Sequence, residues 1–251
     1  MENLNGKVAV VTGGARDIGK AISMSLAKAG AKVVVNYFNS ELYGKETVLE
    51  IEKTGGTAVA IYADVTKQVD VDAMVKTTLD HFGPKIDILV NVAGGLFARK
   101  SIEEMDEDFY NLVMDVNLKS VFLVTKTIKP HMEKGGAIIN FASQAGRDGG
   151  GPGAAIYAAS KGAVITYTRA LAKEFGPQGI RVNALCPGMI ATKFHDDFTK
   201  DEVREKVAGS TPLRREGEAE EVADLVVYLA SEQSSFITGN NIDINGGLAF
   251  S

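Results

Sequence analysis

Short apolar segments recur along the chain and alternate with longer segments of helical periodicity. The apolar runs are residues 8–11, 33–35, 59–62, 86–90, 138–141, 182–185 and 242–244. Between them, one helical face is marked by Ile18, Ile22, Leu26 and Ala29, and a less regular one by Val69, Ala73, Val75 and Leu79. The runs are almost wholly apolar, as in parallel strands covered on both faces. The pattern predicts one doubly wound α/β domain over residues 1–251, with a parallel sheet and helices on both sides.

The polar positions between these elements predict helix starts and two loops. Ser40 and Thr66 stand where N-caps are expected. The glycine-rich stretch 146–154 lies between a predicted strand and a predicted helix, and we interpret it as a mobile loop over a site. Residues 189–212 are charged and helical in pattern, which favours a lid over a substrate.

Composition narrows the function classes. The 251 residues carry a formal net charge of −5, with a pI of about 5.4, which argues against a nucleic-acid interface. No apolar run approaches the roughly 18 residues of a membrane span, and the first strand starts too early for a signal peptide. The single cysteine, Cys186, is weak evidence for a reducing compartment, so we expect a cytoplasmic protein. The histidines have no metal-ligand spacing, so no metal is expected: His81, His131 and His195.

The segment VVTGGARDIGKA, Val10 to Ala21, reads as a strand, a glycine turn and the start of a helix. Such a turn brings backbone N–H groups and the positive end of a helix dipole to a phosphate. Asp17 among the glycines raises the question of like charge near that phosphate. We expect its carboxylate to cap the helix or pair with Arg16, while backbone N–H groups bind the pyrophosphate.

The end of the second strand bears on which dinucleotide is bound. An NAD site usually carries an acidic residue there, whereas this chain reads VVVNYFNS, with Asn36 at the expected position. No acid would repel a 2′-phosphate, and Arg16 would supply positive charge. The sequence therefore favours NADP over NAD.

A second group of polar residues predicts acid–base chemistry. In YAASK, Tyr157 and Lys161 are four residues apart, on one face of a helix. A cation about 4 Å from a partly buried phenol gives roughly 4 kcal/mol, enough to bring a pKa near 10 toward 7. Ser143 ends a strand 14 residues earlier, where it would donate to a carbonyl oxygen.

Taken together, these motifs resemble those of the short-chain dehydrogenases/reductases. TGGARDIG, NVAG at 91–94, Asn117 in DVNLKS, Ser143, Tyr157 with Lys161, PGMIAT at 187–192 and the closing FITGNNIDINGG occur in that family's order and spacing. The resemblance covers essentially the whole chain. It implies a Rossmann sheet of about seven strands, a nicotinamide cofactor and, usually, a homotetramer.

The resemblance also implies a role for each matching residue. Tyr157 would be the general acid/base, Lys161 would lower its pKa and bind the nicotinamide ribose, Ser143 would polarise the carbonyl, and Asn117 would hold a water of the proton relay. The implied cofactor contacts, with Tyr157 and Lys161, are Gly13, Arg16, Asp17, Ile18, Gly19, Asn36, Asp64, Val65, Asn91, Ala93, Gly94, Pro187, Gly188, Ile190 and Thr192. Three positions depart from the family pattern: Asp17, Val92 and Asn245.

The substrate is specified less well than the chemistry. Residues expected around it are mixed: Phe97, Arg99, Lys100, Arg147, Met189, Phe194 and His195. The general reading is reversible hydride transfer between NADPH and a carbonyl or secondary alcohol. A 3-oxoacyl thioester is one candidate substrate, although EFGPQG lacks an arginine that such reductases tend to have. A sugar or polyol dehydrogenase and a non-catalytic NADP-binding scaffold are the alternatives.

Overall fold

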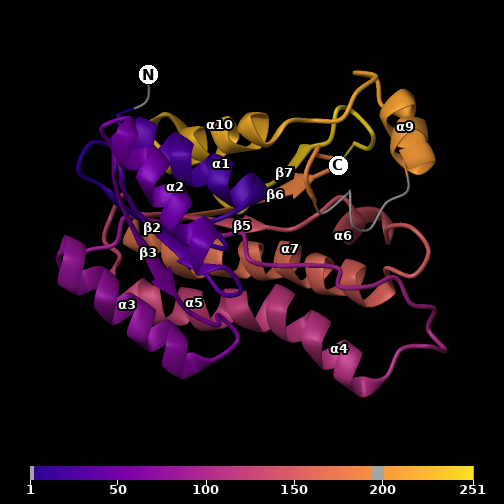
Figure 1. Cartoon of the computed structure of the whole chain (residues 1–251), viewed down its shortest axis with the longest axis horizontal. Helices are drawn as coiled ribbons and strands as arrows, with labels where there is room; N and C mark the ends of the chain where they lie inside the picture. Colours follow the sequence, from indigo (N-terminus) through magenta and orange to yellow (C-terminus); the bar gives the residue numbers. More distant parts are fainter. Residues whose placement is uncertain (1–2, 194–200, 251) are drawn as a thin grey trace.

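The chain folds into seven parallel strands connected by helices (Figure 1). A computed structural model describes residues 3–193 and 201–250. The strands are β1 Val8–Thr12, β2 Lys32–Tyr37, β3 Thr57–Tyr62, β4 Ile88–Asn91, β5 Ala137–Phe141, β6 Arg181–Pro187 and β7 Asn241–Ile244. The helices are α1 Asp17–Lys28, α2 Glu41–Lys53, α3 Gln68–Phe82, α4 Glu107–Met114, α5 Ser120–Ile128, α6 Ala145–Asp148, α7 Ala155–Phe175, α9 Asp201–Ser210 and α10 Ala219–Ala230.

The strand order is β3-β2-β1-β4-β5-β6-β7, and every pair is parallel. The order reverses between β1 and β4, so the chain runs outward in one direction through β3 and in the other through β7. Ligands of open α/β sheets bind at such a switch point, beyond the carboxyl ends of the strands. This arrangement confirms the predicted doubly wound sheet, and it directs attention to the ends of β1, β4 and β5.

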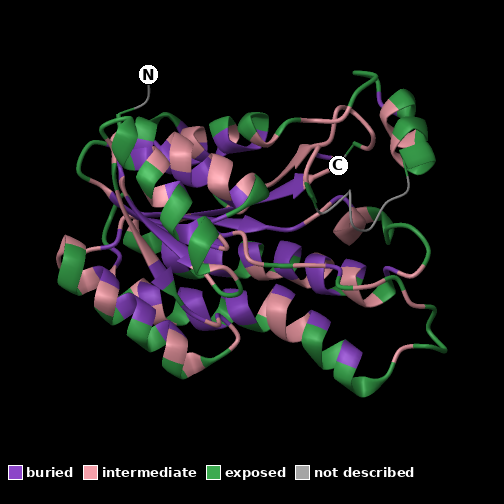
Figure 2. Ribbon diagram, in the orientation of Figure 1, coloured by how far each residue is buried: buried purple, intermediate pink, exposed green. Residues whose placement is uncertain are grey.

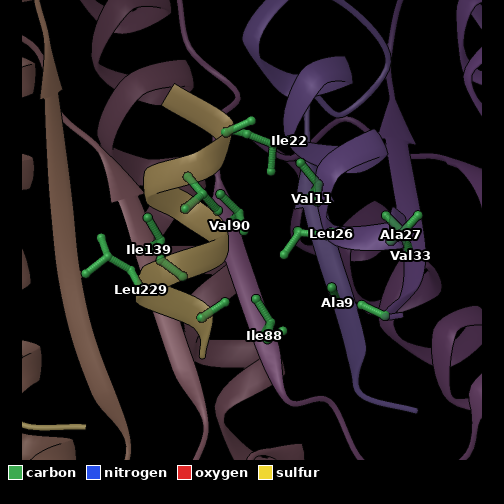
Figure 3. Close-up of a cluster of buried hydrophobic side chains, with 14 of the residues drawn as sticks. Ala9, Val11, Ile22, Leu26, Ala27, Val33, Ile88, Val90, Ile139 and Leu229 are labelled. Carbon is green, nitrogen blue, oxygen red and sulfur yellow. The ribbon is translucent and has the colours of Figure 1, made fainter. Parts of the chain in front are cut away.

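Two apolar cores cover the two faces of the sheet. Alternate strand residues such as Val11, Val90 and Ile139 pack against α1, α2 and α10, and Figure 3 shows Ile22, Leu26 and Leu229 in that layer. The opposite face packs against α3, α5 and α7. Figure 2 shows the central strands buried, whereas β7 at the edge is of intermediate exposure and α9 has no buried side. The near-continuous apolar strands follow from this double cover.

Of the local predictions, the structure confirms one helix cap and contradicts two other placements. Ser40 does cap α2, through its hydroxyl and the N–H of Tyr43. Thr66 does not cap α3, because its hydroxyl donates to Asp64 and the helix begins later, at Gln68. Val69 is 72% exposed, whereas the buried face of that helix is Val71, Met74, Val75 and Thr78. Within the described residues, no helix is long and apolar enough to cross a membrane.

Candidate active site

A row of polar side chains crosses four neighbouring strands near their carboxyl ends. Asn36, Thr12, Asn91 and Asn140 are at corresponding positions of β2, β1, β4 and β5. All four are buried, although they interrupt otherwise apolar strands. Buried polar groups are retained where hydrogen bonds satisfy them. The row marks the place where the strands end and the loops of the site begin.

Asn36 holds the glycine turn, which is a different role from the predicted one. Its side-chain oxygen accepts from Gly13 N at 3.1 Å, and its amide faces the carbonyls of Ile61 and Ala63 at 3.4 and 3.2 Å. The residue is 2% exposed. These bonds occupy its amide inside the fold, so its observed role is to support the glycine turn, and its contact with a cofactor stays a prediction. The next residue, Tyr37, instead packs over Gly44 of α2.

The backbone of the glycine turn is shaped for a close neighbour. Gly13 has a φ of +63°, and a Cβ there would lie 3.2 Å from Ala93 Cα. At Gly19 a Cβ would lie 2.1 Å from the Gly13 carbonyl oxygen, so no other residue fits. Arg16, the N-cap of α1, makes no side-chain cap bond, which leaves the first-turn N–H groups without one. These N–H groups are suited to bind a phosphate.

Asp17 neither caps α1 nor pairs with Arg16, so the sequence-based expectation for its carboxylate is wrong. It has a φ of +49°, a conformation that glycine adopts freely and aspartate tolerates. Its Oδ1 atom accepts a hydrogen bond of 3.1 Å from the backbone N of Lys193. The glycine turn is thereby joined to a segment 176 residues away in sequence.

The crossing segment, residues 187–193, runs from the end of β6 toward the start of α1. Its Ile190 is 3% exposed and belongs to the same apolar core as Ala15 and Ile22. Gly188 lies so close to Asn245 that a Cβ would be 2.7 Å from that residue's Cβ. The Thr192 hydroxyl donates to Ile190 O at 3.2 Å. Pro187, Gly188, Ile190 and Thr192 therefore belong to a segment whose end is bonded to the first residue of α1, and their contact with a cofactor stays a prediction.

Asn117 lies in a π-helical turn, Asp115–Lys119, between α4 and α5. Such turns widen a helix locally and are frequent at functional sites. The side chain is fully buried and clamps Gly95: its amide donates to Gly95 O at 2.8 Å and its oxygen accepts from Gly95 N at 3.0 Å. A third bond reaches Val113 O at 2.9 Å. Its side chain therefore fixes the loop after β4.

Ser143, Tyr157 and Lys161 converge at the end of β5 and the start of α7. The Tyr157 side chain is hydrogen-bonded to Ser143. Lys161 Nζ lies 5.9 Å from the centre of the Tyr157 ring and donates to Phe141 O at 2.8 Å. A Cβ on Gly94 would be 3.0 Å from Lys161 Nζ and 2.7 Å from Asn117 Oδ1, so only glycine leaves room between them.

Burial governs the protonation of this group. It raises the pKa of the Tyr157 phenol, and the Ser143 hydrogen bond acts in the opposite direction with a smaller effect. Burial also lowers the pKa of Lys161, to about 8, although the buried Cys186 thiol acts in the opposite sense. The expectation that Lys161 lowers the pKa of this phenol stays a prediction. The phenol holds its proton at neutral pH, as a proton donor must.

Three other predicted contacts are placed as follows. Asn91 is buried, and its amide donates to Asn140 Oδ1 at 2.9 Å and Thr125 Oγ1 at 3.3 Å, so it links β4 to β5 and α5. Asp64 accepts from Thr66 N at 2.9 Å and is followed by the buried Val65. These two residues continue the chain directly beyond β3, beside the Asn36 amide.

The residues expected around a substrate are only partly described. Arg99 donates to Pro152 O at 3.0 Å, and Lys100 N to Gly153 O at 3.2 Å, which joins the loop after β4 to the glycine-rich loop. Arg147 instead pairs with Asp243 at 2.6 Å, with both side chains largely buried. Phe194 and His195, with the rest of 194–200 in the predicted lid, lie outside the described residues.

Sequence reasoning missed several residues that build the site. Thr12 Oγ1 accepts from Val92 N and Ala93 N at 3.1 and 3.2 Å, which aligns the loop after β4. Asn140 donates to Thr168 Oγ1 at 2.9 Å and thereby ties α7 to β5. Polar residues inside apolar strands were the available signal. The bond from Lys161 to the Phe141 carbonyl could not have been predicted in this way, because every residue has a backbone carbonyl.

The geometry of this end of the sheet fits a nicotinamide dinucleotide. Glycines stand where these backbone segments pack too closely for a Cβ, at Gly13, Gly19, Gly94 and Gly188, and the first turn of α1 lies directly after the glycine turn. Tyr157 and Lys161 belong to α7, whose Lys161 reaches the end of β5. Among the described residues, no group of three or more His, Cys, Asp or Glu could hold a metal ion.

Comparison with known proteins finds relatives that are similar over almost the whole chain. A family model described as enoyl-(acyl carrier protein) reductase matches residues 13–249. A 3-oxoacyl-acyl-carrier-protein reductase of Synechocystis sp. is 42% identical, over 99% of both chains. The short-chain dehydrogenase/reductase of Serratia marcescens superimposes with a TM-score of 0.93 at 36% identity, covering 98% of this chain and 99% of that one. The chain belongs to the short-chain dehydrogenase/reductase family.

Two further relatives of this short-chain dehydrogenase/reductase show the breadth of the family. Glucose 1-dehydrogenase 2 of Bacillus subtilis is 37% identical, over 98% of this chain and 96% of that protein. A short-chain dehydrogenase of Burkholderia cenocepacia, solved in complex with NADP, has a TM-score of 0.91 at 33% identity and covers 98% of this chain and 99% of that one. The protein is thus a nicotinamide-dependent oxidoreductase acting on CH–OH or C=O groups.

Proposed function

We propose that the protein reduces the keto group of 3-oxoacyl thioesters with NADPH. The observation that carries this proposal is the hydrogen-bonded pair of Ser143 and Tyr157, beside a buried Lys161. The similarity to a 3-oxoacyl-acyl-carrier-protein reductase at 42% identity supports the substrate class.

The chain's own residues would divide the chemistry as follows. When bound, the nicotinamide supplies the hydride for the carbonyl carbon. Ser143 donates a hydrogen bond to the carbonyl oxygen and orients it toward Tyr157. The phenol then gives its proton to that oxygen as negative charge develops there. Lys161 acts as a nearby cation that stabilises the phenolate left behind, and Asn117 keeps the loop at Gly94 and Gly95 open beside it.

NADP preference is the second part of the proposal. Between the end of β2 and the start of α2 the chain has no carboxylate to repel a 2′-phosphate. The first acid, Glu41, is paired with Lys45 at 2.6 Å. Arg16 is exposed next to the glycine turn and supplies the positive charge. The NADP complex of the Burkholderia relative supports the same choice.

The assignment of Tyr157 is tested by Tyr157→Phe, with Tyr167→Phe on the same helix as the matched control. We expect Tyr157→Phe to abolish turnover of acetoacetyl thioesters and to leave NADPH binding, measured by calorimetry, unchanged. Tyr167→Phe should retain activity. Substantial turnover by Tyr157→Phe would refute the assignment. A matched titration with NADH decides the cofactor preference.

A sugar or polyol dehydrogenase is the second candidate, and the similarity to glucose 1-dehydrogenase 2 favours it. The wild-type protein should be assayed with acetoacetyl thioesters and with a panel of sugars, following NADPH by absorbance. Higher kcat/KM for a sugar would replace the thioester proposal. No turnover on any carbonyl or alcohol would favour the non-catalytic scaffold.

Three further expectations stay predictions. A homotetramer is expected from the resemblance to the family, and light scattering of the purified protein measures it. A single folding unit over residues 1–251 should give one cooperative unfolding transition. A cytoplasmic location is the third, and fractionation of the source cells tests it.

A further inference from the structure

Arg147 connects α6, the short helix that follows Ser143, to the edge strand β7. Its Nε atom donates to Asp243 Oδ1 at 2.6 Å, and its Nη2 atom donates to the backbone carbonyl of Asn241. The side chains of Arg147 and Asp243 are both largely buried. One planar guanidinium thus makes two bonds to the same strand, in a fork that a lysine cannot reproduce.

The position of α6 depends on contacts of this kind. The helix has four residues, too few to be stable through its own hydrogen bonds. At its start, Asn245 Nδ2 donates to Gln144 Oε1 at 2.7 Å, which is a second bond from the end of β7. On its other side, Gly146 packs so closely against α7 that a Cβ would lie 2.8 Å from Gly162 N. The helix is therefore held between α7 and β7, and Arg147 is a charged anchor on the β7 side.

The position of α6 in turn sets that of the Ser143 hydroxyl. Ser143 Oγ accepts a hydrogen bond of 3.1 Å from Ala145 N, at the start of α6. A hydroxyl that accepts such a bond keeps its O–H as a donor, and the accepted bond polarises that donor. The Cys186 thiol of β6 also interacts with both the Arg147 side chain and the Ser143 backbone. A displacement of Arg147 would therefore reach Ser143 by two routes.

We propose that Arg147 is a positioning residue for Ser143: its pair with Asp243 fixes α6, and α6 holds the Ser143 hydroxyl toward the substrate carbonyl. This inference rests on the proposed role of Ser143 in carbonyl reduction. Arg147 acts through Ser143 and not on the reacting atoms, since its guanidinium is directed toward β7. A purely structural Arg147 would instead affect stability and leave kcat unchanged.

A double variant removes the anchor without leaving a buried charge unpaired. Arg147→Met combined with Asp243→Leu replaces the ion pair by apolar side chains, a change that buried pairs often tolerate. We expect this double variant to fold, which thermal unfolding checks. Arg147→Lys is the conservative variant, because it keeps a cation beside Asp243 but loses the fork.

Arg181→Met is the matched control for the loss of a partly buried arginine. Arg181 lies at the start of β6 and donates to the backbone carbonyls of Leu229 and Ser231, whereas Ser143 follows the other end of the neighbouring strand β5. We expect this variant to lower the Tm and to leave kcat within about twofold of the wild type.

The first measurement is steady-state kinetics, together with calorimetry of NADPH binding. The double variant should lower kcat about tenfold, because a small displacement of a group that acts in the transition state is costly. Its Kd for NADPH should be unchanged, and the kcat of Arg147→Lys should lie between those of the double variant and the wild type. A wild-type kcat in the double variant would overturn the proposal.

The second measurement combines the double variant with Ser143→Ala, to decide whether the effect passes through Ser143. Ser143→Ala alone should lower kcat about a hundredfold or more, as the loss of a donor to a developing oxyanion does. Adding the double variant should then lower kcat by less than about twofold, because the group that Arg147 positions is gone. A further loss of about tenfold would show that the two effects are independent, and it would overturn the proposal.

The outcomes also separate this proposal from the proposed function. The kinetics are measured with the carbonyl or alcohol that the wild type converts fastest. If that compound is a sugar and not a thioester, the proposed substrate is overturned and the role of Arg147 is still tested. Equal kcat in Ser143→Ala and the wild type would overturn both proposals.

Discussion

The buried Lys161 makes stability depend on pH in a way that can be measured. The side chain is 4% exposed, and burial lowers its pKa from 10.5 to about 8. Between these values the unfolded chain binds a proton that the folded chain does not, so stability rises with pH across this window. Below about pH 8 Lys161 is charged in both the folded and the unfolded protein, and burying that charge lowers the free energy of unfolding. This loss disappears as the pH approaches 10.5.

The size of the effect follows from that difference in pKa. At 1.36 kcal/mol per pH unit, the change from 10.5 to about 8 is worth about 3 kcal/mol. Lys161→Met removes the titration but also the bond to the Phe141 carbonyl, at a cost of about 1–3 kcal/mol that does not depend on pH. At neutral pH the two changes nearly offset, so the variant should fold about as stably as the wild type.

The assay is urea unfolding of both proteins at several pH values from 7 to 10.5. The difference in unfolding free energy should move by about 3 kcal/mol in favour of the wild type across this range. Lys173→Met, which removes an exposed lysine from the same helix, is the matched control and should show no such trend. A constant difference between wild type and Lys161→Met would refute the reasoning, since it would mean that Lys161 stays charged in the folded protein.

Two substitutions test the packing of the site. Gly94→Ala should fold but lower kcat at least tenfold, because its methyl group would lie 2.7 Å from Asn117 Oδ1 and 3.0 Å from Lys161 Nζ; steady-state kinetics measures this, and wild-type turnover would contradict it. Asn36→Ala should lower the free energy of unfolding by about 1–3 kcal/mol and weaken NADPH binding, because Gly13 N and the carbonyls of Ile61 and Ala63 lose their partner. Denaturant unfolding and calorimetry check the second change, and unaltered binding would show that the glycine turn does not need Asn36.

The sequence by itself determined the sheet and the grouping of the proposed catalytic residues. Apolar runs of strand length, separated by helical periodicity, specify a sheet covered on both faces, because each face must be removed from water. The positions of Ser143, Tyr157 and Lys161 were also readable, since a one-turn spacing and a strand end are local properties. Val69 was misplaced because an irregular apolar pattern fits more than one helical face.

Only the tertiary structure decided what each polar side chain faces. Asn36 and Asp17 were assigned from their neighbours in sequence, whereas their partners lie across the sheet and 176 residues along the chain. The pKa values of Tyr157 and Lys161 likewise depend on burial, which no spacing specifies. The sequence specifies which polar groups a residue carries. The packing of distant segments determines which of these groups are buried and which partners they meet, and burial and partners together set their hydrogen bonds and their pKa values.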